Sequence, residues 1–389
     1  MKKIRTYNTI ATLGLERFPR DHYEVASEIT HPDAILLRSH VLSPDQIPPC
    51  VLAIARAGAG TNNIPLEYCT QQGIVVFNTP GANANAVKEL VLAGMLLSTR
   101  GIYEGMQYVQ ELPTDLAGDN FVTQLEAEKK RFKGGELAGK TLGVVGLGAI
   151  GSLVANMAIS LGMRVVGYDP AISVEAAWRL SSEVEKADNL SSLLSRSDYC
   201  SLHVPAIDAT HHLINQDSLR AAGPGMVLLN FAREQIVDEQ ALLPALEEGR
   251  LSRYVTDFPT PALLAKERVM LMPHIGASTR EAEENCAVMA AEQLTDFIEH
   301  GNIRHSVNFP IAQMPRSTGI RLTFANENVA GVLGHVLSVL AEANINVIDM
   351  LNKSRDSVAY NILDLEQQPD AKVLADLAEV EHVIHLRLI

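Results

Sequence analysis

Short apolar runs alternate along this chain with segments whose apolar residues recur every three or four positions. Such runs are typical of strands buried in a parallel sheet, and the longer segments are typical of helices that cover it. The first part of the chain has three runs, at 34–37, 51–55 and 74–77. A second series starts at residue 141, with runs at 141–145, 164–168, 199–204, 226–230, 253–257 and 269–272. The pattern predicts two α/β units.

Two helical segments connect these units. An apolar-rich segment, roughly 86–109, is expected to form one long helix that bridges them. The run Ser278-Thr279-Arg280-Glu281 is a capping-box pattern, and it predicts a helix to about residue 299 that returns the chain to the first unit. Residues 310–317 contain two prolines and few apolar residues, which predicts a linker.

The tail, residues 318–389, alternates strand and helix patterns in the order β-α-β-β-α-β, which predicts a ferredoxin-like unit. Its strands are expected at 319–325, 345–351, 358–365 and 383–388, and its helices over 332–340 and 370–378. This segment is too short for a second nucleotide-binding fold. We expect a small-ligand or dimerisation module.

Composition narrows the function classes. The 389 residues carry a formal net charge of −14, and the pI is near 5.3. These values argue against non-specific binding of nucleic acid or anionic membranes, for which a basic face is expected. No secretion signal is visible at the start, and the apolar stretch around 90–97 is far shorter than the roughly 20 residues of a membrane span. We therefore expect a cytoplasmic protein.

The four cysteines indicate neither a metal site nor a disulfide framework. Cys50, Cys69, Cys200 and Cys286 are scattered and have no metal-ligand spacing. We expect them to be reduced and structural, and we expect no metal.

A glycine pattern lies between two of the predicted strands. Gly146, Gly148 and Gly151 form a G-x-G-x-x-G sequence between the runs 141–145 and 164–168, and Asp169 follows the second run. In a dinucleotide site these glycines allow a tight turn, close approach of the diphosphate, and close packing of the helix on the sheet. Asp169 would accept the ribose hydroxyls and repel a 2′-phosphate, which favours NAD over NADP. The alternative is a glycine-rich turn followed by a second turn at Asp169, which leaves the spacing unexplained.

Two further residues have the chemistry that hydride transfer at a hydroxyl carbon requires. Arg233 follows the run 226–230 and could bind a carboxylate with its planar fork, and His274 follows the run 269–272 and could exchange a proton. Both come after strands, where α/β sheets bind ligands. Taken singly, Arg233 could form a surface pair with Glu234, and His274 could merely shape its turn.

Together these motifs resemble the D-isomer-specific 2-hydroxyacid dehydrogenases, and most closely those that act on a phosphorylated substrate and carry a C-terminal ACT domain. The resemblance rests on a glycine loop at 57–63, the fingerprint at 146–151, His203-Val204-Pro205, Arg233, Pro273-His274 and the tail, all in family order. It implies two Rossmann-like or flavodoxin-like α/β domains with an active-site cleft between them, followed by the ACT domain. The implied boundaries are a substrate domain at 1–97 completed by 284–310, an NAD domain at 98–283, a linker at 311–317, and the ACT domain at 318–389.

The resemblance also implies an activity and a set of site residues. The reaction would be the NAD-dependent oxidation of 3-phospho-D-glycerate to 3-phosphooxypyruvate, the first step of L-serine biosynthesis. Arg233 would bind the carboxylate and His274 would take the hydroxyl proton. The implied substrate contacts are Arg38, Ala57, Gly58, Ala59 and Lys88. The implied cofactor contacts are Gly146, Gly148, Ala149, Ile150, Gly151, Asp169, His203, Val204, Pro205, Thr210, Phe231, Ala232, Asp257 and Gly276.

The sequence departs from the family pattern at one informative place. Family members have an Asp followed five residues later by a Glu that orients the catalytic His, whereas this chain reads Asp257-Phe258-Pro259-Thr260-Pro261. Without that Glu the tautomer of the histidine is less fixed. Asp257 or Glu234 could take over the role.

In related ACT domains L-serine binds between two paired domains as a feedback inhibitor. Asn328 and Asn346 match the positions that would hold it, although Asn328 could equally be a helix N-cap and Ala330 replaces a common proline. The resemblance further implies a homodimer or homotetramer with contacts at the 86–109 helix and the ACT edge. Two other functions remain open: a hydroxypyruvate or glyoxylate reductase of the same family, and a noncatalytic NAD-sensing regulator.

Overall fold

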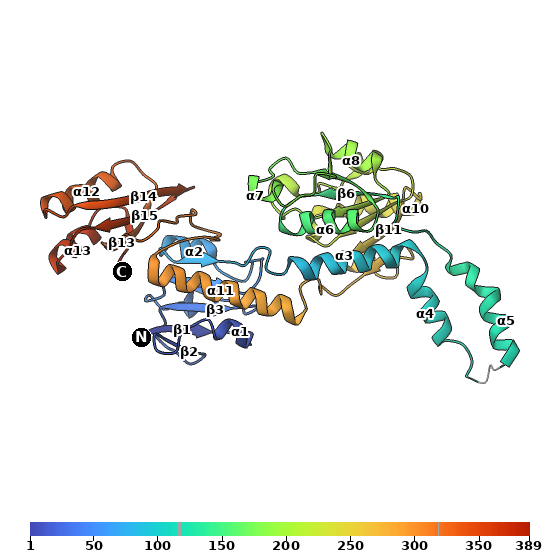
Figure 1. Cartoon of the computed structure of the whole chain (residues 1–389), viewed down its shortest axis with the longest axis horizontal. Coiled ribbons are helices and arrows are strands. Elements are labelled where there is room, and N and C mark those ends of the chain that lie inside the picture. Colours follow the sequence, from blue (N-terminus) through green and yellow to red (C-terminus); the bar gives the residue numbers. More distant parts are fainter. Residues whose placement is uncertain (115–117, 318) are drawn as a thin grey trace. The chain divides into compact units, whose positions relative to one another are not determined.

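The computed structural model describes residues 1–114, 118–317 and 319–389, so residue 318, the first of the expected ACT domain, lies outside the described residues. The chain forms two compact units, one of Met1–Asn83 with Thr279–Ile389 and the other of Ala84–Ser278 (Figure 1). Three sheets, two parallel and one antiparallel, confirm the predicted α/β fold class with a separate C-terminal sheet. No helix among the described residues is long and apolar enough to cross a membrane.

The first unit begins with a five-stranded parallel sheet of order β2-β1-β3-β4-β5. Its strands are β1 (Lys2–Thr6), β2 (Tyr23–Ala26), β3 (Ala34–Leu37), β4 (Ala53–Arg56) and β5 (Val75–Phe77), and its short helices are α1 (Thr12–Leu15) and α2 (Leu66–Gln71). The three predicted apolar runs correspond to β3, β4 and β5. The sequence analysis missed β1 and β2, because β2 is an edge strand and β1 has a single apolar residue, Ile4, among charged and polar ones.

The long helix α11 (Arg280–His300) packs on this sheet. It confirms the helix that the capping pattern predicts. Its N-cap is Thr279, whose Oγ1 accepts the Ala282 amide, and it ends where Gly301 adopts a left-handed φ of 71°. The small buried residues of α11 pack in one core with β1, β3, β4 and β5.

The C-terminal part of the first unit is a four-stranded antiparallel sheet of order β14-β15-β13-β16. Its elements are β13 (Ile320–Glu327), α12 (Val332–Glu342), β14 (Val347–Arg355), β15 (Val358–Leu365), α13 (Ala371–Ala378) and β16 (Val383–Leu388), which confirms the predicted β-α-β-β-α-β order. The helices cover one face of the sheet through residues such as Leu340 and Leu377.

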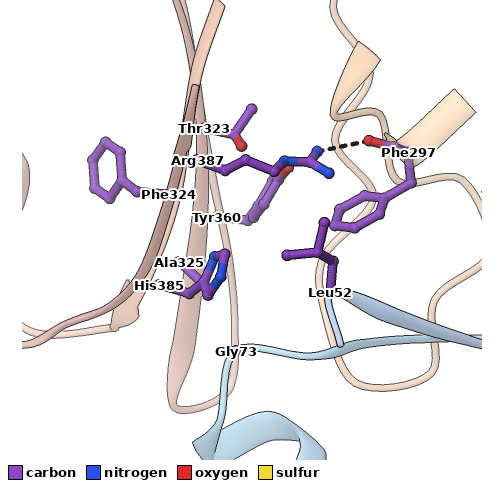
Figure 2. A pocket seen from close by; sticks show the side chains of 9 residues that line it. All are labelled: Leu52, Gly73, Phe297, Thr323, Phe324, Ala325, Tyr360, His385 and Arg387. Atoms are coloured by element: carbon purple, nitrogen blue, oxygen red, sulfur yellow. Dashed lines mark hydrogen bonds between the residues drawn. The ribbon is translucent and has the colours of Figure 1, made fainter. Parts of the chain in front are cut away.

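The other face of this sheet shares a core with the N-terminal sheet. Tyr360 of β15 lies in one cluster with Phe77, Phe297 and Phe309, and its hydroxyl donates to the Gly301 carbonyl at 2.9 Å. Figure 2 shows part of this contact, where Arg387 donates to the Phe297 carbonyl beside a cavity of about 10 Å³. That volume is about the space that one water molecule needs, so the two sheets are closely packed.

Arginine side chains from the C-terminal segment cap the end of α11. They donate to three carbonyls of its last turn: Arg387 to Phe297, which also accepts the Gly301 amide, Arg316 to Glu299 and Arg321 to His300. A cation is also favoured at a helix C-terminus by the helix dipole. This contact fixes the C-terminal sheet to the helix.

The second unit is a seven-stranded parallel sheet of order β12-β11-β10-β9-β6-β7-β8. The strands are β6 (Thr141–Val145), β7 (Arg164–Tyr168), β8 (Glu185–Lys186), β9 (Tyr199–Leu202), β10 (Met226–Asn230), β11 (Leu251–Thr256) and β12 (Val269–Leu271). All six predicted runs are strands, and β8 was missed because it has only two exposed residues. The strands that follow β6 in the chain lie on both sides of it in the sheet, β7 and β8 on one side and β9 to β12 on the other. Open α/β sheets bind ligands where the strand order reverses in this way.

The helices of this unit are α3 (Ala84–Thr99), α4 (Ile102–Gln110), α5 (Gly118–Glu128), α6 (Ala149–Ser160), α7 (Val174–Ala177), α8 (Leu190–Arg196), α9 (Gln216–Arg220) and α10 (Glu239–Glu247). The prediction of one helix over 86–109 was wrong. The helix breaks at Gly101, whose amide donates to the Phe132 carbonyl instead of continuing the helical ladder. Helix α3 packs on α6, inside the second unit.

Candidate functional site

The glycine pattern forms the turn between β6 and α6. Gly146 has a left-handed φ of 86°, and a Cβ on Gly151 would lie 1.9 Å from the Gly146 carbonyl oxygen. A Cβ on Gly148, the N-cap of α6, would meet no atom within 4 Å. Ala149 and Ile150 open the helix. The loop therefore offers an open approach to a helix N-terminus, which fits a diphosphate.

Asp169 lies at the end of β7 beside this loop. Its Oδ2 accepts the Leu147 amide at 2.8 Å, and its Oδ1 accepts the Ala171 amide at 2.9 Å. The carboxylate is therefore held next to the fingerprint, where a ribose would follow the diphosphate.

The residues after β9 supply a neutral histidine. His203 shares a 2.8 Å hydrogen bond with the Ser201 hydroxyl, and burial lowers the pKa of His203 to about 3. Its Nδ1 is buried and has no hydrogen-bond partner in the described part of the chain. Val204 and Pro205 continue this edge, and Thr210 donates back to the Pro205 carbonyl. This nitrogen lies beside the point where the strand order reverses. A buried nitrogen without a hydrogen-bond partner at that point is consistent with a bound cofactor.

Arg233 follows β10 on a turn fixed by a buried asparagine. Asn230, which is not exposed, donates to the Arg233 carbonyl at 2.8 Å and accepts the Ala232 amide at 3.1 Å. Phe231 and Ala232 are buried in the same turn. The Arg233 guanidinium donates to the Ala232 carbonyl and forms no ion pair among the described residues, so it remains available for an anion.

His274 follows β12 on a turn fixed by Asp257. The two carboxylate oxygens of Asp257 accept the Ile275 and Gly276 amides at 2.8 and 2.6 Å, and the side chain is only 2% exposed. His274 is exposed and has a left-handed φ of 57°. Among the described residues no carboxylate is hydrogen bonded to its ring, because Asp257 binds the backbone and Glu234 contacts only Gln235.

The candidate substrate residues of the first unit follow β3 and β4. Arg38 forms an ion pair with Glu283 of α11 at 2.7 Å. Ala57, Gly58 and Ala59 form the loop after β4. Lys88 belongs to the other unit, on α3, where it donates to Asn85.

The sequence analysis missed Arg56. This residue ends β4, its Nε donates to the Arg38 carbonyl at 3.0 Å, and a Cβ on Gly58 would lie 2.6 Å from its Nη1. Leu37 and Arg56 are partners in the pairing of β3 with β4, so Arg38 and Arg56 lie at the same edge. The sequence feature that could have identified Arg56 is its position as a basic residue directly after the apolar run 51–55. Two arginines at one sheet edge can bind a doubly charged anion.

The two asparagines of the C-terminal sheet lie far apart in one chain. Asn328 follows β13 and donates to the Asp356 carbonyl, and it is not a helix N-cap, because Gly331 has that position. Asn346 precedes β14. Ile320 and Val347 both pair with Leu365, so the start of β14 lies at the end of the sheet opposite to Asn328. A ligand that contacts both asparagines needs two copies of the domain.

Comparison with known proteins gives a consistent result. Residues 92–276 match the NAD binding domain of the D-isomer specific 2-hydroxyacid dehydrogenases. The chain is 32% identical over 353 residues to D-3-phosphoglycerate dehydrogenase of Haemophilus influenzae. The aligned region covers 88% of this chain and 82% of the relative. The chain is 33% identical over 353 residues to the Escherichia coli protein of the same name, with 87% and 82% covered.

Solved structures agree with these matches. NAD+-bound 3-phosphoglycerate dehydrogenase of Entamoeba histolytica aligns with a TM-score of 0.62 and 28% identity, over 79% of this chain and 98% of that one. D-mandelate dehydrogenase of Rhodotorula graminis shares the fold, with a TM-score of 0.67, 23% identity and coverage of 81% and 99%. The cofactor is NAD. The chain belongs to the family of D-isomer-specific 2-hydroxyacid dehydrogenases.

Proposed function

We propose that this protein oxidises C2 of 3-phospho-D-glycerate to give 3-phosphooxypyruvate, with NAD as the acceptor, as the first step of L-serine biosynthesis. The observation that carries this proposal is the pair Arg233 and His274, each held after a strand of the NAD-binding sheet by a buried polar residue. The relatives named D-3-phosphoglycerate dehydrogenase support the choice of substrate.

The residues present fit each part of this substrate. Arg233 binds the carboxylate, because its guanidinium has no competing acid among the described residues. Arg38 and Arg56 bind the phosphate, since both lie at the same edge of the N-terminal sheet. The Ala57 and Gly58 amides already donate to the Leu37 and Arg56 carbonyls, so of this loop the Ala59 amide donates to the carboxylate. Lys88 adds a further cation.

The chemistry requires removal of a proton from the C2 hydroxyl oxygen and of a hydride from C2 itself. NAD, when bound, accepts the hydride from C2. His274 takes the hydroxyl proton, because it is exposed, follows the strand edge, and has no hydrogen-bond partner in the described residues that would occupy its ring nitrogens. Asp169 binds the ribose hydroxyls, and the loop at 146–151 holds the diphosphate at the N-terminus of α6.

The test is NADH formation with 3-phospho-D-glycerate, measured beside D-glycerate, which lacks the phosphate. We expect activity with the phosphorylated substrate, loss of at least about a hundredfold in kcat/KM for Arg233→Ala and for His274→Ala, and no change for Arg164→Ala. Arg164 is an exposed arginine at the start of β7 and serves as the matched control. Absence of NADH formation by the unmodified protein would overturn the proposal, and equal rates with D-glycerate would point to a reductase of unphosphorylated acids.

We further propose that the C-terminal sheet is an ACT domain that binds L-serine between two copies of the chain. Asn328 of one copy and Asn346 of the other would hold the amino and carboxyl groups. The homo-oligomer would use the edge of this sheet and the helices α4 and α5, whose Tyr103, Met106 and Val122 are exposed. Calorimetry with L-serine, and light scattering to measure the mass, test this; a monomer without a binding signal would contradict it.

A further inference from the structure

Phe258 occupies a position between the two proposed catalytic side chains. Its ring centroid lies 4.9 Å from that of His274, at an interplanar angle of 58°. The Arg233 guanidinium carbon lies 6.0 Å from the same ring centroid. A tilted ring pair at this separation is attractive, and 6 Å is about the limit for a cation–π contact. One aromatic ring therefore contacts both the imidazole and the guanidinium.

The backbone of Phe258 is fixed by the same buried polar residues that fix its neighbours. Its amide donates to Thr256 Oγ1 at 3.1 Å, and that hydroxyl donates to the Asn230 carbonyl at 3.0 Å. Neither Thr256 nor Asn230 is exposed. Pro259 follows and disfavours helical backbone at Phe258. The ring therefore starts from a rigid turn that is tied to the turn of Arg233.

The imidazole of His274, by contrast, lacks polar support. Among the described residues it makes no hydrogen bond or ion pair, and the Asp257 carboxylate is used by the Ile275 and Gly276 amides. The turn fixes the backbone of His274, and the ring contact that its imidazole makes among the described residues is the one with Phe258. The chain has no Glu four residues after Phe258, where the family pattern would provide a carboxylate.

We propose that Phe258 is a positioning residue that holds the His274 imidazole at a set separation from the Arg233 guanidinium. The inference rests on the proposed function. The substrate carboxylate and the C2 hydroxyl are on adjacent carbons, so their two partners must keep a fixed separation. A rigid apolar ring in contact with both meets this requirement, and it keeps water out of the space between them.

The first test needs neither substrate nor cofactor. The imidazole carbon of every histidine is labelled with ¹³C, and the His274 signal is assigned from its loss in His274→Gln. The ring current of Phe258 displaces this signal, so we expect it to move toward its random-coil position in Phe258→Leu and to stay in place in Phe258→Tyr. The matched control is Phe132→Leu, because Phe132 also contacts an aromatic ring, Tyr108, and a guanidinium, Arg131.

The second test is steady-state kinetics of the same variants. We expect kcat of Phe258→Leu to fall by about tenfold or more, since misplacement of a catalytic group acts on turnover. The KM for NAD and the unfolding temperature should remain near those of the unmodified protein. Phe258→Tyr should retain activity, and Phe132→Leu should not alter it.

Two results would overturn the inference: an unchanged His274 signal in Phe258→Leu, or an unchanged kcat in that variant. Failure of the proposed function would look different. The unmodified protein would then form no NADH with 3-phospho-D-glycerate, while the signal displacement in the free protein would still report whether Phe258 holds the imidazole.

Discussion

Arg321 and Asp364 form an ion pair in which neither side chain is exposed to solvent. Arg321 donates through Nε and Nη2 to the two carboxylate oxygens at 2.7 and 2.9 Å. Its Nη1 donates to the carbonyls of His300 and Met314. The pair therefore ties two neighbouring strands of the C-terminal sheet to the end of α11 and to the segment that follows it.

Removal of one partner from this pair should be strongly destabilising. A single replacement, Arg321→Met or Asp364→Asn, is expected to lower the free energy of unfolding by about 3–5 kcal/mol, because it leaves a buried group without its partner. Denaturant unfolding measures this. Arg355→Met is the control, since Arg355 is exposed, forms a 3.7 Å ion pair with the adjacent Asp356 and donates to the Ser306 carbonyl; it should cost at most about 1 kcal/mol. Equal effects of the buried and exposed replacements would contradict the prediction.

The same pair predicts how stability depends on pH. Burial alone would raise the pKa of Asp364, but hydrogen bonds from Arg321 and Ser317 outweigh it and hold the pKa below its ordinary value. The unfolded chain therefore binds this proton more tightly. The contribution of Asp364 to stability is complete above about pH 4 and is lost as pH falls through its folded-state pKa. Unfolding midpoints of Asp364→Asn should depend less on pH below about pH 4 than those of the unmodified protein.

Glu283 should weaken substrate binding in the proposed reaction. Its carboxylate pairs with Arg38, so it competes with an incoming phosphate and repels it. We expect Glu283→Gln to lower KM for 3-phospho-D-glycerate by about twofold to fivefold, the range of a partly exposed ion pair. Glu281→Gln, an exposed acid in the same turn of α11, is the control. An increase in KM would show instead that Glu283 orients Arg38.

The two glycines of the fingerprint should respond differently to alanine. In Gly151→Ala the new Cβ would lie 1.9 Å from a backbone oxygen, so the unit must distort and its unfolding temperature should fall. In Gly148→Ala the Cβ meets no protein atom, so stability should be kept while affinity for NADH falls. Thermal unfolding without cofactor, combined with NADH titration, separates the two effects. Loss of stability in Gly148→Ala would argue against its facing the diphosphate.

Asp169 should set the preference for NAD over NADP. In Asp169→Asn the charge that repels a 2′-phosphate is removed, while one oxygen remains to accept the Leu147 amide. The ratio of kcat/KM for NAD to that for NADP should fall by about tenfold or more. An unchanged ratio would place the discriminating residue elsewhere.

The turn of His274 should depend on Asp257 and not on Glu234. The Asp257 carboxylate accepts two backbone N–H groups, whereas the side-chain amide in Asp257→Asn has one oxygen and accepts only one of them. Both kcat and the free energy of unfolding should therefore fall, the latter by about 1–3 kcal/mol. Glu234→Gln should behave like the unmodified protein, because the Glu234 carboxylate accepts from Gln235 and has no hydrogen bond to His274 among the described residues. The pH–rate profiles of both variants complete the comparison; a changed profile in Glu234→Gln would reinstate that residue.

The elements that the sequence predicted well are those with a strong local pattern. Buried strands such as β6 and β10 are continuous apolar runs, and α11 has both a capping residue and a terminal glycine. The division of the segment 86–109 could not be predicted. It depends on the Phe132 carbonyl, which belongs to a residue thirty-one positions later in the chain and accepts the Gly101 amide.

The candidate site shows the same limit. Arg233 and His274 could be proposed from the chemistry of their residue types after predicted strands. The use of both Asp257 oxygens by backbone amides could not, because it depends on how the turn at 274–276 folds back onto β11. Arg56 was missed for a similar reason: only the pairing of β3 with β4 brings it beside Arg38.

The core shared by the N-terminal and C-terminal sheets has a consequence for synthesis on the ribosome. The second unit is one continuous stretch, Ala84–Ser278, so it can fold as soon as it has been translated. The first unit is built from both ends of the chain, and its aromatic layer of Phe77, Phe297, Phe309 and Tyr360 is complete only when β15 has emerged. The residues before Ala84 therefore wait for residues that follow Ser278, and a nascent chain exposes this layer until β15 has emerged.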